Sequence, residues 1–373
     1  MNILYNNEIN ISEDMWITLN DTLSRDAIKQ LISDTIEKNN VALPMRDISP
    51  IDAQESFEKL QALDSQKIII DSPWFSRYEY SEQFPLTDIV IKSTTIGNLA
   101  SDYFLQTERW KCDSINAPSP YRTWITEKFR LTLLNALWSL QVKKVDTTQL
   151  RSLIGLRKYI ASQFRPSAAK AIYDYFNAQH VLDFSSGWGD RLCGFLSSST
   201  TKSYVGIDPN TNLIAGYQQQ IAAFNTTKDV QMISSGAEIA ENYTTKKYDL
   251  IFTSPPYFNI ERYTHEKNQS FKKYKKLDAW LNDFLFTTLD HAWSSLEDNG
   301  HLIINISDVY SNHTINKICD PMNTFISQLP HAEYVGCWGY EMRKRPNSGA
   351  LKNKVGVFAE PVWIWKKGTR GVG

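Results

Sequence analysis

The chain has 373 residues and a net charge of −1, with 40 Lys and Arg residues against 41 Asp and Glu residues. At ~100–200 residues per domain, this length predicts two domains, or one domain with a large extension. Hydrophobic residues make up 42% of the chain and aromatic residues 12%, including 11 Trp. This composition excludes the disordered, collagen-like and coiled-coil classes.

The sequence shows neither a membrane span nor a secretion signal. No apolar run approaches the ~18 residues that cross a bilayer, and the N-terminus lacks the basic and apolar regions of a signal peptide. The four cysteines contain no C-x-x-C pair, which argues against a disulfide scaffold and a zinc site. We therefore expect a cytoplasmic protein without a membrane or metal partner. The cysteines are Cys112, Cys193, Cys319 and Cys337.

Residues 1–150 are predicted to form a mainly helical N-terminal domain. Apolar residues recur with helical spacing in 22–38, where Asp21 is the expected N-cap. A strongly apolar pattern predicts a second helix over 121–141. The stretch 64–118 is rich in Ser, Pro and aromatic residues, and its pattern predicts no particular element.

Residues 151–373 are predicted to form an α/β domain of Rossmann type. Strands and helices alternate here, a pattern typical of a parallel sheet covered by helices on both faces. Pro166 is expected to begin the first helix, and another helix is expected over 277–297. The expected strands are five in alternation and a closing antiparallel pair, at 180–184, 202–208, 230–234, 246–254, 301–307, 332–342 and 355–367.

A glycine turn follows the first of these strands. Gly187 and Gly189 lie between Asp183 and Asp190, and the next strand ends in Asp208, whose carboxylate could accept both hydroxyls of a ribose. The third glycine of a G-x-G-x-x-G dinucleotide motif is missing. The two acids flanking the turn suit a ligand with an amino group and a sulfonium, as in S-adenosyl-L-methionine. A plain strand–helix turn and another kind of nucleotide site remain alternatives.

A second motif follows the fourth strand, where Ser254-Pro255-Pro256-Tyr257 precedes Phe258. With this spacing from the glycine turn, the tetrapeptide resembles the catalytic motif of the S-adenosylmethionine-dependent DNA amino-methyltransferases of the N4-cytosine and N6-adenine type. The resemblance covers about 160–366 and none of 1–150. It implies a seven-stranded Rossmann-like methyltransferase sheet and a role in DNA methylation, as in restriction–modification. Three further segments take part in it: 164–170, 235–238 and Glu360-Pro361-Val362-Trp363, the last as a purely structural feature.

The chemistry of an exocyclic amine explains the residue types in the tetrapeptide. Its lone pair is delocalised into the base, so the amine is a poor nucleophile. The Ser254 side chain and the Pro255 carbonyl could accept its two hydrogens and direct the lone pair toward a methyl donor. Tyr257 and Phe258 could stack on a base flipped out of a duplex.

The resemblance implies three groups of site residues. The catalytic group is Ser254, Pro255, Pro256 and Tyr257. The cofactor group is Phe164, Arg165, Pro166, Asp183, Phe184, Ser185, Gly187, Gly189, Asp208, Pro209, Gly236 and Ala237. The substrate group is Phe258, Arg262, Lys272, Lys273, Arg343 and Arg345.

Two short stretches, 258–276 and 341–354, each carry a net charge of +4. We expect them to contact phosphates, since Lys and Arg bind the nucleic-acid backbone. No large recognition domain follows the tetrapeptide, so target recognition is expected in these stretches or in residues 1–150. DNA is the expected partner and RNA a possible one.

Several functions remain open at this point. Within the resemblance, Ser in the first motif position favours N4 of cytosine over N6 of adenine. RNA bases and protein glutamine amides present the same planar NH2 group. A binding protein with a degenerate fold is the alternative from another class.

Overall fold

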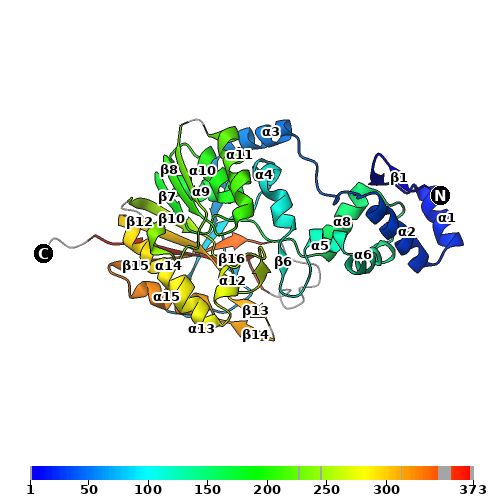
Figure 1. Ribbon diagram of the computed structural model, residues 1–373. Coiled ribbons are helices and arrows are strands. Elements are labelled where there is room, and N and C mark those ends of the chain that lie inside the picture. The colour runs from blue at the N-terminus through cyan, green and yellow to red at the C-terminus, as the bar shows by residue number, and fades with distance from the viewer. Residues whose placement is uncertain (1, 226, 244–245, 312, 343–353, 370–373) are drawn as a thin grey trace. The chain divides into compact units, whose positions relative to one another are not determined.

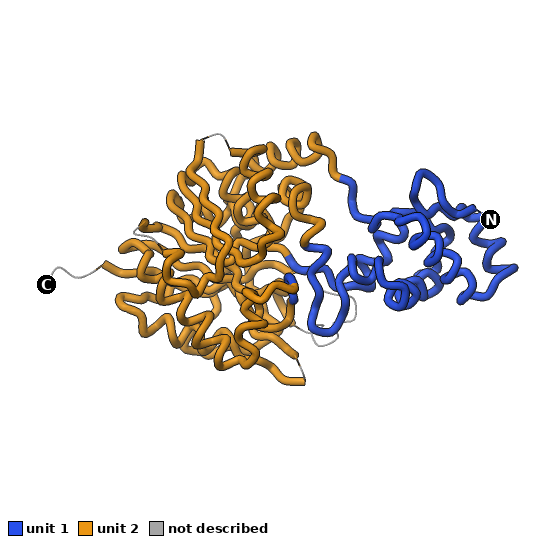
Figure 2. Tube along the Cα trace, viewed as in Figure 1, with its two compact units in different colours: residues 1–47, 109–162, 262–264 blue, residues 48–108, 163–261, 265–373 orange. Residues whose placement is uncertain are grey.

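The computed structural model describes residues 2–225, 227–243, 246–311, 313–342 and 354–369. Figure 2 shows two compact units. Unit 1 consists of residues 1–47, 109–162 and 262–264, and unit 2 of residues 48–108, 163–261 and 265–373. In the described part of the chain, no helix has both the length and the apolar character that a bilayer span requires.

Unit 1 is mainly helical and has its own apolar core, which includes Ile28, Ile32, Leu137 and Leu153. Its elements are β1 (Leu4–Tyr5), β2 (Glu8–Ile9), α1 (Glu13–Thr22), α2 (Arg25–Lys38), β6 (Asp113–Ser114), α5 (Pro120–Ile125), α6 (Glu127–Leu134), α7 (Ala136–Ser139) and α8 (Thr147–Arg157).

Two details of unit 1 differ from the sequence prediction. Asp21 lies inside α1, and Ser24 caps α2 by accepting the backbone N–H of Ala27. The expected helix over 121–141 is divided into α5, α6 and α7. The break between α5 and α6 lies at Thr126, which adopts an extended conformation with ψ near 115°. This break lets the carbonyl of Trp124 accept a hydrogen bond from the buried guanidinium of Arg130 at 2.6 Å.

Unit 2 is built on a ten-stranded sheet among the described residues, with the order β3-β5-β15-β16-β12-β10-β7-β8-β9 and β4 paired with β16. The predicted Rossmann-like α/β fold is confirmed. Neighbours from β12 through β9 are parallel, whereas β16 is antiparallel to both β12 and β15. The seven expected strands are β7 (His180–Asp183), β8 (Ser203–Ile207), β9 (Asp229–Ile233), β10 (Tyr248–Thr253), β12 (Leu296–Asn305), β15 (Ala332–Glu341) and β16 (Val357–Lys367).

Residues 48–108 belong to unit 2, which differs from the predicted boundary near residue 150. Their strand β5 pairs with β15, β3 pairs with β5, and β4 pairs with β16, so this segment extends the sheet. These strands are short and their partners lie far along the chain, so no local pattern indicates the pairing. The segment comprises α3 (Pro50–Gln61), η1 (Ser65–Lys67), β3 (Ile69–Asp71), β4 (Trp74–Phe75), β5 (Leu86–Ile91) and α4 (Asn98–Trp110), whose last two residues lie in unit 1.

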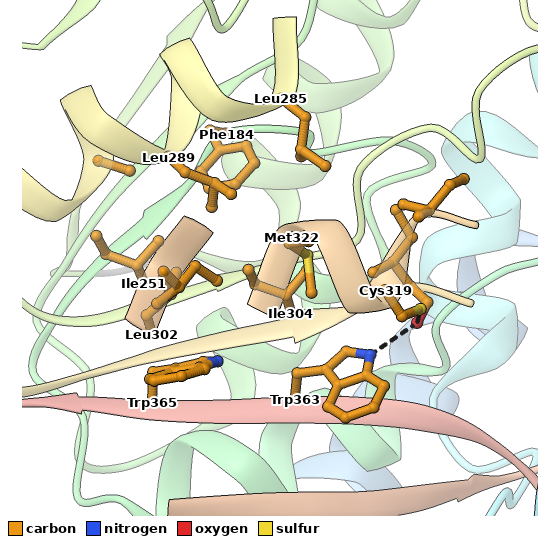
Figure 3. Packing of buried hydrophobic residues seen from close by; sticks show 14 of the residues in the cluster. Phe184, Ile251, Leu285, Leu289, Leu302, Ile304, Cys319, Met322, Trp363 and Trp365 are labelled. Atoms are coloured by element: carbon orange, nitrogen blue, oxygen red, sulfur yellow. Dashed lines mark hydrogen bonds between the residues drawn. The ribbon is translucent and has the colours of Figure 1, made fainter. Parts of the chain in front are cut away.

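Helices cover both faces of the sheet (Figure 1). Successive strand residues point to opposite faces. On β10, Phe252 contacts Tyr173 of α9, whereas Ile251 belongs to the core cluster that includes Leu285 and Leu289. Figure 3 shows these two leucines directed toward the strands. The remaining elements are α9 (Pro166–Tyr175), α10 (Asp190–Ser197), η2 (Thr211–Leu213), α11 (Ile214–Phe224), η3 (Ala240–Asn242), β11 (Glu261–Arg262), α12 (Ser270–Lys273), α13 (Leu277–Ala279), η4 (Trp280–Phe286), α14 (Thr287–Ser295), β13 (Val309–Ser311), β14 (Thr314–Asn316) and α15 (Cys319–Ser327).

The expected helix over 277–297 is continuous through α13, η4 and α14, and η4 is a π-helical segment. It ends at Ser295, two residues before the expected end, and β12 begins at the next residue, Leu296. On the other face, Pro166 begins α9 as expected. The tryptophans of β16 are buried in the same core cluster, and the indole N–H of Trp363 donates to the Ile306 carbonyl at 3.2 Å (Figure 3).

The contact between α9 and α10 depends on Gly194. A Cβ there would lie 2.7 Å from the Ala169 Cβ and 2.8 Å from the backbone nitrogen of Lys170. We predict that Gly194→Ala destabilises the protein by ~1–3 kcal/mol, the usual cost of overpacking. Gly155→Ala is the matched control: nothing lies within 4 Å of its Cβ position in α8, so a gain of ~0.5–1 kcal/mol is expected. Urea denaturation measures both, and an unchanged midpoint for Gly194→Ala would contradict the prediction.

Candidate functional site

The predicted motifs lie at one edge of the sheet of unit 2. The parallel strands β7, β8, β9, β10 and β12 all present their carboxyl ends there. In open α/β sheets this is the edge where ligands bind. Because β16 runs in the opposite direction, the residues near its beginning reach the same edge.

The glycine turn and Asp208 are brought together as predicted. The backbone N–H of Gly187 donates to Asp208 Oδ2 at 2.9 Å, and the N–H of Asn210 donates to Oδ1 at 2.9 Å. Burial raises the pKa of Asp208 to about 6, although these two backbone donors oppose the shift. Gly187 has a positive φ of 59°, and no atom lies closer than 3.8 Å to its Cβ position. A Cβ there would make only ordinary van der Waals contacts, with the Ser185 carbonyl oxygen at 3.8 Å and Arg191 Nη2 at 4.0 Å. A ligand could approach the backbone of this glycine, which carries no side chain.

Asp183 is directed into the protein rather than toward this space. Its side chain is fully buried and accepts hydrogen bonds from Arg191 Nε at 2.8 Å and Nη2 at 3.2 Å, and from the Tyr204 hydroxyl at 2.8 Å. Burial disfavours the Arg191 charge, but Asp183 outweighs it and keeps the pKa of Arg191 above its usual value. Arg191 also donates to the Ser185 carbonyl. These contacts correct the expected direct binding of a ligand amine by Asp183, because Arg191 and Tyr204 already occupy the carboxylate.

Some of the other predicted cofactor residues are packed in the interior, and the rest are partly exposed at the sheet edge. Gly189 is required by packing, since a Cβ there would lie 2.6 Å from Gln220 Oε1 at a φ of 76°. Phe184 and Ala237 are buried in the core. Phe164 stacks on Tyr340, with ring centroids 4.4 Å apart, and the backbone N–H of Arg165 donates to the Tyr340 hydroxyl. The residues at least partly exposed at the edge are Arg165, Ser185, Gly187, Asp208 and Pro209.

The tetrapeptide directly follows β10 and lies beside the end of β12. The Ser254 hydroxyl donates to Asn305 Oδ1 at 3.4 Å, and the Asn305 amide nitrogen donates to the Pro361 carbonyl at 3.1 Å. The Tyr257 hydroxyl lies 3.1 Å from Glu360 Oε2 and 3.5 Å from Asn305 Oδ1. Burial raises the pKa of both Tyr257 and Glu360, the latter to about 7.

Sequence reasoning missed Asn305 and treated Glu360 as purely structural. The available signal was their position, since Asn305 lies near the end of the predicted strand 301–307 and Glu360 lies in the first half of the predicted strand 355–367. Phe258 was expected to stack on a base, but it is buried in the core against Trp280, with ring centroids 6.0 Å apart. Its side chain is therefore part of the scaffold.

The predicted basic stretch contains a segment that crosses the loops after β8 and β9. We call residues 265–276 the strap. Asn268 of the strap donates to the Pro209 carbonyl at 2.7 Å, and Glu266 accepts the backbone N–H of Thr211 at 3.2 Å. Lys273 pairs with Glu238 at 2.6 Å. The strap therefore lies against the strand ends that hold Asp208 and Gly236.

The strap changes the interpretation of the predicted phosphate contacts. Lys273 is paired with Glu238, and Lys272 donates to the His265 carbonyl, so both cations already have partners within the chain. Lys275, Lys276 and Arg262 are exposed. Arg343 and Arg345 lie outside the described residues. Within the described ranges, no group of His, Cys, Asp and Glu is arranged to hold a metal ion.

Comparisons with known proteins give likenesses of fold only. No protein-family model and no curated protein matches the chain. TrmN from Thermus thermophilus is 14% identical over 54% of this chain, with a TM-score of 0.36, and the match spans 48% of TrmN, about half its length. An rRNA methylase from Streptococcus thermophilus is 12% identical over 56% of this chain and 100% of its own, with a TM-score of 0.35. The N-methyltransferase NodS from Bradyrhizobium japonicum is 9% identical over 54% of this chain and 94% of its own, with a TM-score of 0.35.

The buried pair of Arg191 and Asp183 should be essential for stability. We predict that Arg191→Met destabilises the protein by ~3–5 kcal/mol, because it leaves the Asp183 carboxylate buried without its counter-charge. Tyr204→Phe is the control that removes only one hydrogen bond from the same carboxylate, and ~1.5 kcal/mol is expected for it. Urea denaturation at neutral pH measures both changes. A cost for Arg191→Met no larger than that for Tyr204→Phe would contradict the assigned role.

Proposed function

We propose that the protein transfers a methyl group from S-adenosyl-L-methionine to an exocyclic amine of a DNA base, with N4 of cytosine favoured over N6 of adenine. The observation that carries the proposal is the placement of two predicted motifs at one sheet edge. The Gly187–Asp208 contact follows β7 and β8, and the tetrapeptide follows the neighbouring strand β10.

The residues around Gly187 fit such a cofactor. Gly187 carries no side chain, which allows close approach to its backbone. The Asp208 carboxylate retains lone pairs for two ribose hydroxyls. The strap packs against Pro209 and Thr211 and so covers the loop that directly follows Asp208. When bound, the cofactor supplies an electrophilic methyl group on a sulfonium.

The contacts of Ser254 suit the activation of an amine. Its hydroxyl proton is directed to Asn305 Oδ1, which leaves the Ser254 oxygen lone pairs available to accept an amine hydrogen. The Pro255 carbonyl is the second expected acceptor, and the two prolines restrict the backbone that presents it. Holding both hydrogens would direct the nitrogen lone pair at the methyl group, so catalysis would consist mainly of positioning. Such a step needs no metal ion.

The charge distribution favours a nucleic acid over a protein amide as substrate. Residues 109–162 of unit 1 contain ten Lys and Arg residues but only three Asp and Glu. Of these cations, Lys143, Lys144 and Arg157 are exposed on α8 and the turn before it. Lys144 also pairs with Asp146 at 2.8 Å, and Arg157 donates to the Ser139 hydroxyl at 2.8 Å. A basic surface of this kind attracts phosphates. We therefore assign target recognition to unit 1, with RNA as the alternative nucleic acid.

Nucleoside analysis tests the proposed function. We predict that DNA incubated with the protein and isotope-labelled S-adenosyl-L-methionine yields labelled N4-methylcytosine, detected by mass spectrometry after digestion. Ser254→Ala should reduce the rate about tenfold or more with unchanged cofactor affinity, because the lost interaction acts mainly in the transition state. Label in N6-methyladenine or in RNA would select the corresponding alternative. Label in no base of either nucleic acid would contradict the proposal.

Cofactor affinity should depend on the protonation of Asp208. The charged carboxylate accepts the ribose hydroxyls, so affinity should be constant above the pKa of about 6 and fall as the pH is lowered through it. Asp208→Asn should weaken binding about ten- to hundredfold at neutral pH, the equivalent of ~1.5–3 kcal/mol for a charge-assisted hydrogen bond. It should also abolish this pH dependence. Titration calorimetry measures both effects, and a variant that keeps the wild-type pH profile would remove Asp208 from the site.

A further inference from the structure

A cluster of polar side chains lies directly behind the tetrapeptide. Glu360 is the fourth residue of β16, and the register pairs Val362 with Asn305 at the end of β12. Glu360 therefore lies two residues beyond this pair, at the edge where the tetrapeptide begins. Its Oε2 accepts the Tyr257 hydroxyl at 3.1 Å, and the residue is half-buried.

We propose that Glu360 is a positioning residue of the methyl-transfer site, which fixes the ring of Tyr257 through its hydroxyl so that the target base can stack on it. This inference rests on the proposed function and deepens it. The sequence prediction gave Glu360 no role beyond the structure of the last strand. The contact with Tyr257 assigns it one.

The distribution of hydrogen bonds explains why a second hydrogen-bond acceptor is needed at this position. The Tyr257 hydroxyl has two acceptors within 3.5 Å, Glu360 Oε2 and Asn305 Oδ1, but only one proton to donate. Because Glu360 Oε2 is the nearer acceptor, it takes that proton. Asn305 Oδ1 then remains available for the hydroxyl of Ser254. The two ends of the tetrapeptide thus have separate acceptors. Tyr257 is bound to the Glu360 carboxylate and Ser254 to the Asn305 amide oxygen.

The orientation of Asn305 supports the same division. Its amide nitrogen donates to the Pro361 carbonyl at 3.1 Å, so its oxygen must face the tetrapeptide. Asn305 is buried and cannot turn without losing this bond. The residue that follows Glu360 therefore fixes the acceptor of Ser254, while Glu360 itself fixes Tyr257. One short stretch of β16 holds both ends of the motif.

The geometry also indicates that Glu360 is not retained for an ion pair. Among the described residues, Lys and Arg form no salt bridge with it, and after burial the like charge of Glu261 also raises its pKa. Burial next to a like charge is unfavourable for a carboxylate. The hydrogen bond from the Tyr257 hydroxyl offsets part of this unfavourable free energy.

A double-mutant cycle tests the proposal. The proteins are wild type, Tyr257→Phe, Glu360→Ala and the double variant, with methyl transfer to DNA and cofactor affinity measured for each. We expect each single change to lower kcat about tenfold with cofactor affinity unchanged. Since both remove the same hydrogen bond, the double variant should be no slower than Tyr257→Phe. Glu360→Gln retains an acceptor and should restore most of the lost rate.

Glu341→Ala is the matched control. Glu341 is a partly buried carboxylate at the same edge, on β15, and it accepts the backbone N–H of Ser93 at 2.9 Å. A change there should leave kcat within about twofold of wild type. If Glu360→Ala lowers kcat by the same factor in the Tyr257→Phe background, or if Glu341→Ala has an equal effect, the positioning role is overturned while the proposed function stands. If wild type transfers no methyl group to any nucleic acid, both are overturned.

Discussion

The candidate site depends on a buried ion pair between Asp183 and Arg191. β7 ends at Asp183, and Arg191 is the second residue of α10, so their contact closes the intervening glycine turn. Arg191 also holds the Ser185 carbonyl within this turn, and Tyr204 of β8 donates to the same carboxylate. The glycine turn after β7 and the adjacent strand β8 are thereby held in one arrangement. In that arrangement the Gly187 N–H meets Asp208.

The direction of β16 decides what else reaches the edge. A sheet of parallel strands presents only the residues that follow each strand, and here these include the glycine turn, Asp208 and the tetrapeptide. An antiparallel strand inserted beside β12 presents residues near its beginning instead. Glu360 and the Pro361 carbonyl are placed behind the tetrapeptide for this reason. The Tyr257 hydroxyl of the motif is thereby bound by a residue of a strand that lies about a hundred residues further along the chain.

The strap illustrates that a charge pattern alone does not identify the partners of its residues. Six cations between residues 258 and 276 suggest a surface for phosphates. In the structure, Lys273 neutralises Glu238, and Asn268 bonds the Pro209 carbonyl, so part of this segment covers the strand ends of the site. Whether a lysine contacts solvent, a phosphate or a carboxylate is decided by what the fold brings opposite it. That information is not contained in the local sequence.

Local patterns in the sequence determined the seven core strands, the helix that begins at Pro166 and the placement of two motifs at strand ends. These features follow from alternation, turn chemistry and apolar runs, which act over a few residues. Tertiary structure alone decided that residues 48–108 extend the sheet, since β3 and β4 have three and two residues and pair with β5 and β16. It also decided that Asp183 is directed inward, that Phe258 is part of the core, and that Asn305 and Glu360 hold the tetrapeptide. Each of these outcomes depends on contacts between residues distant in sequence, whose energies no local pattern expresses.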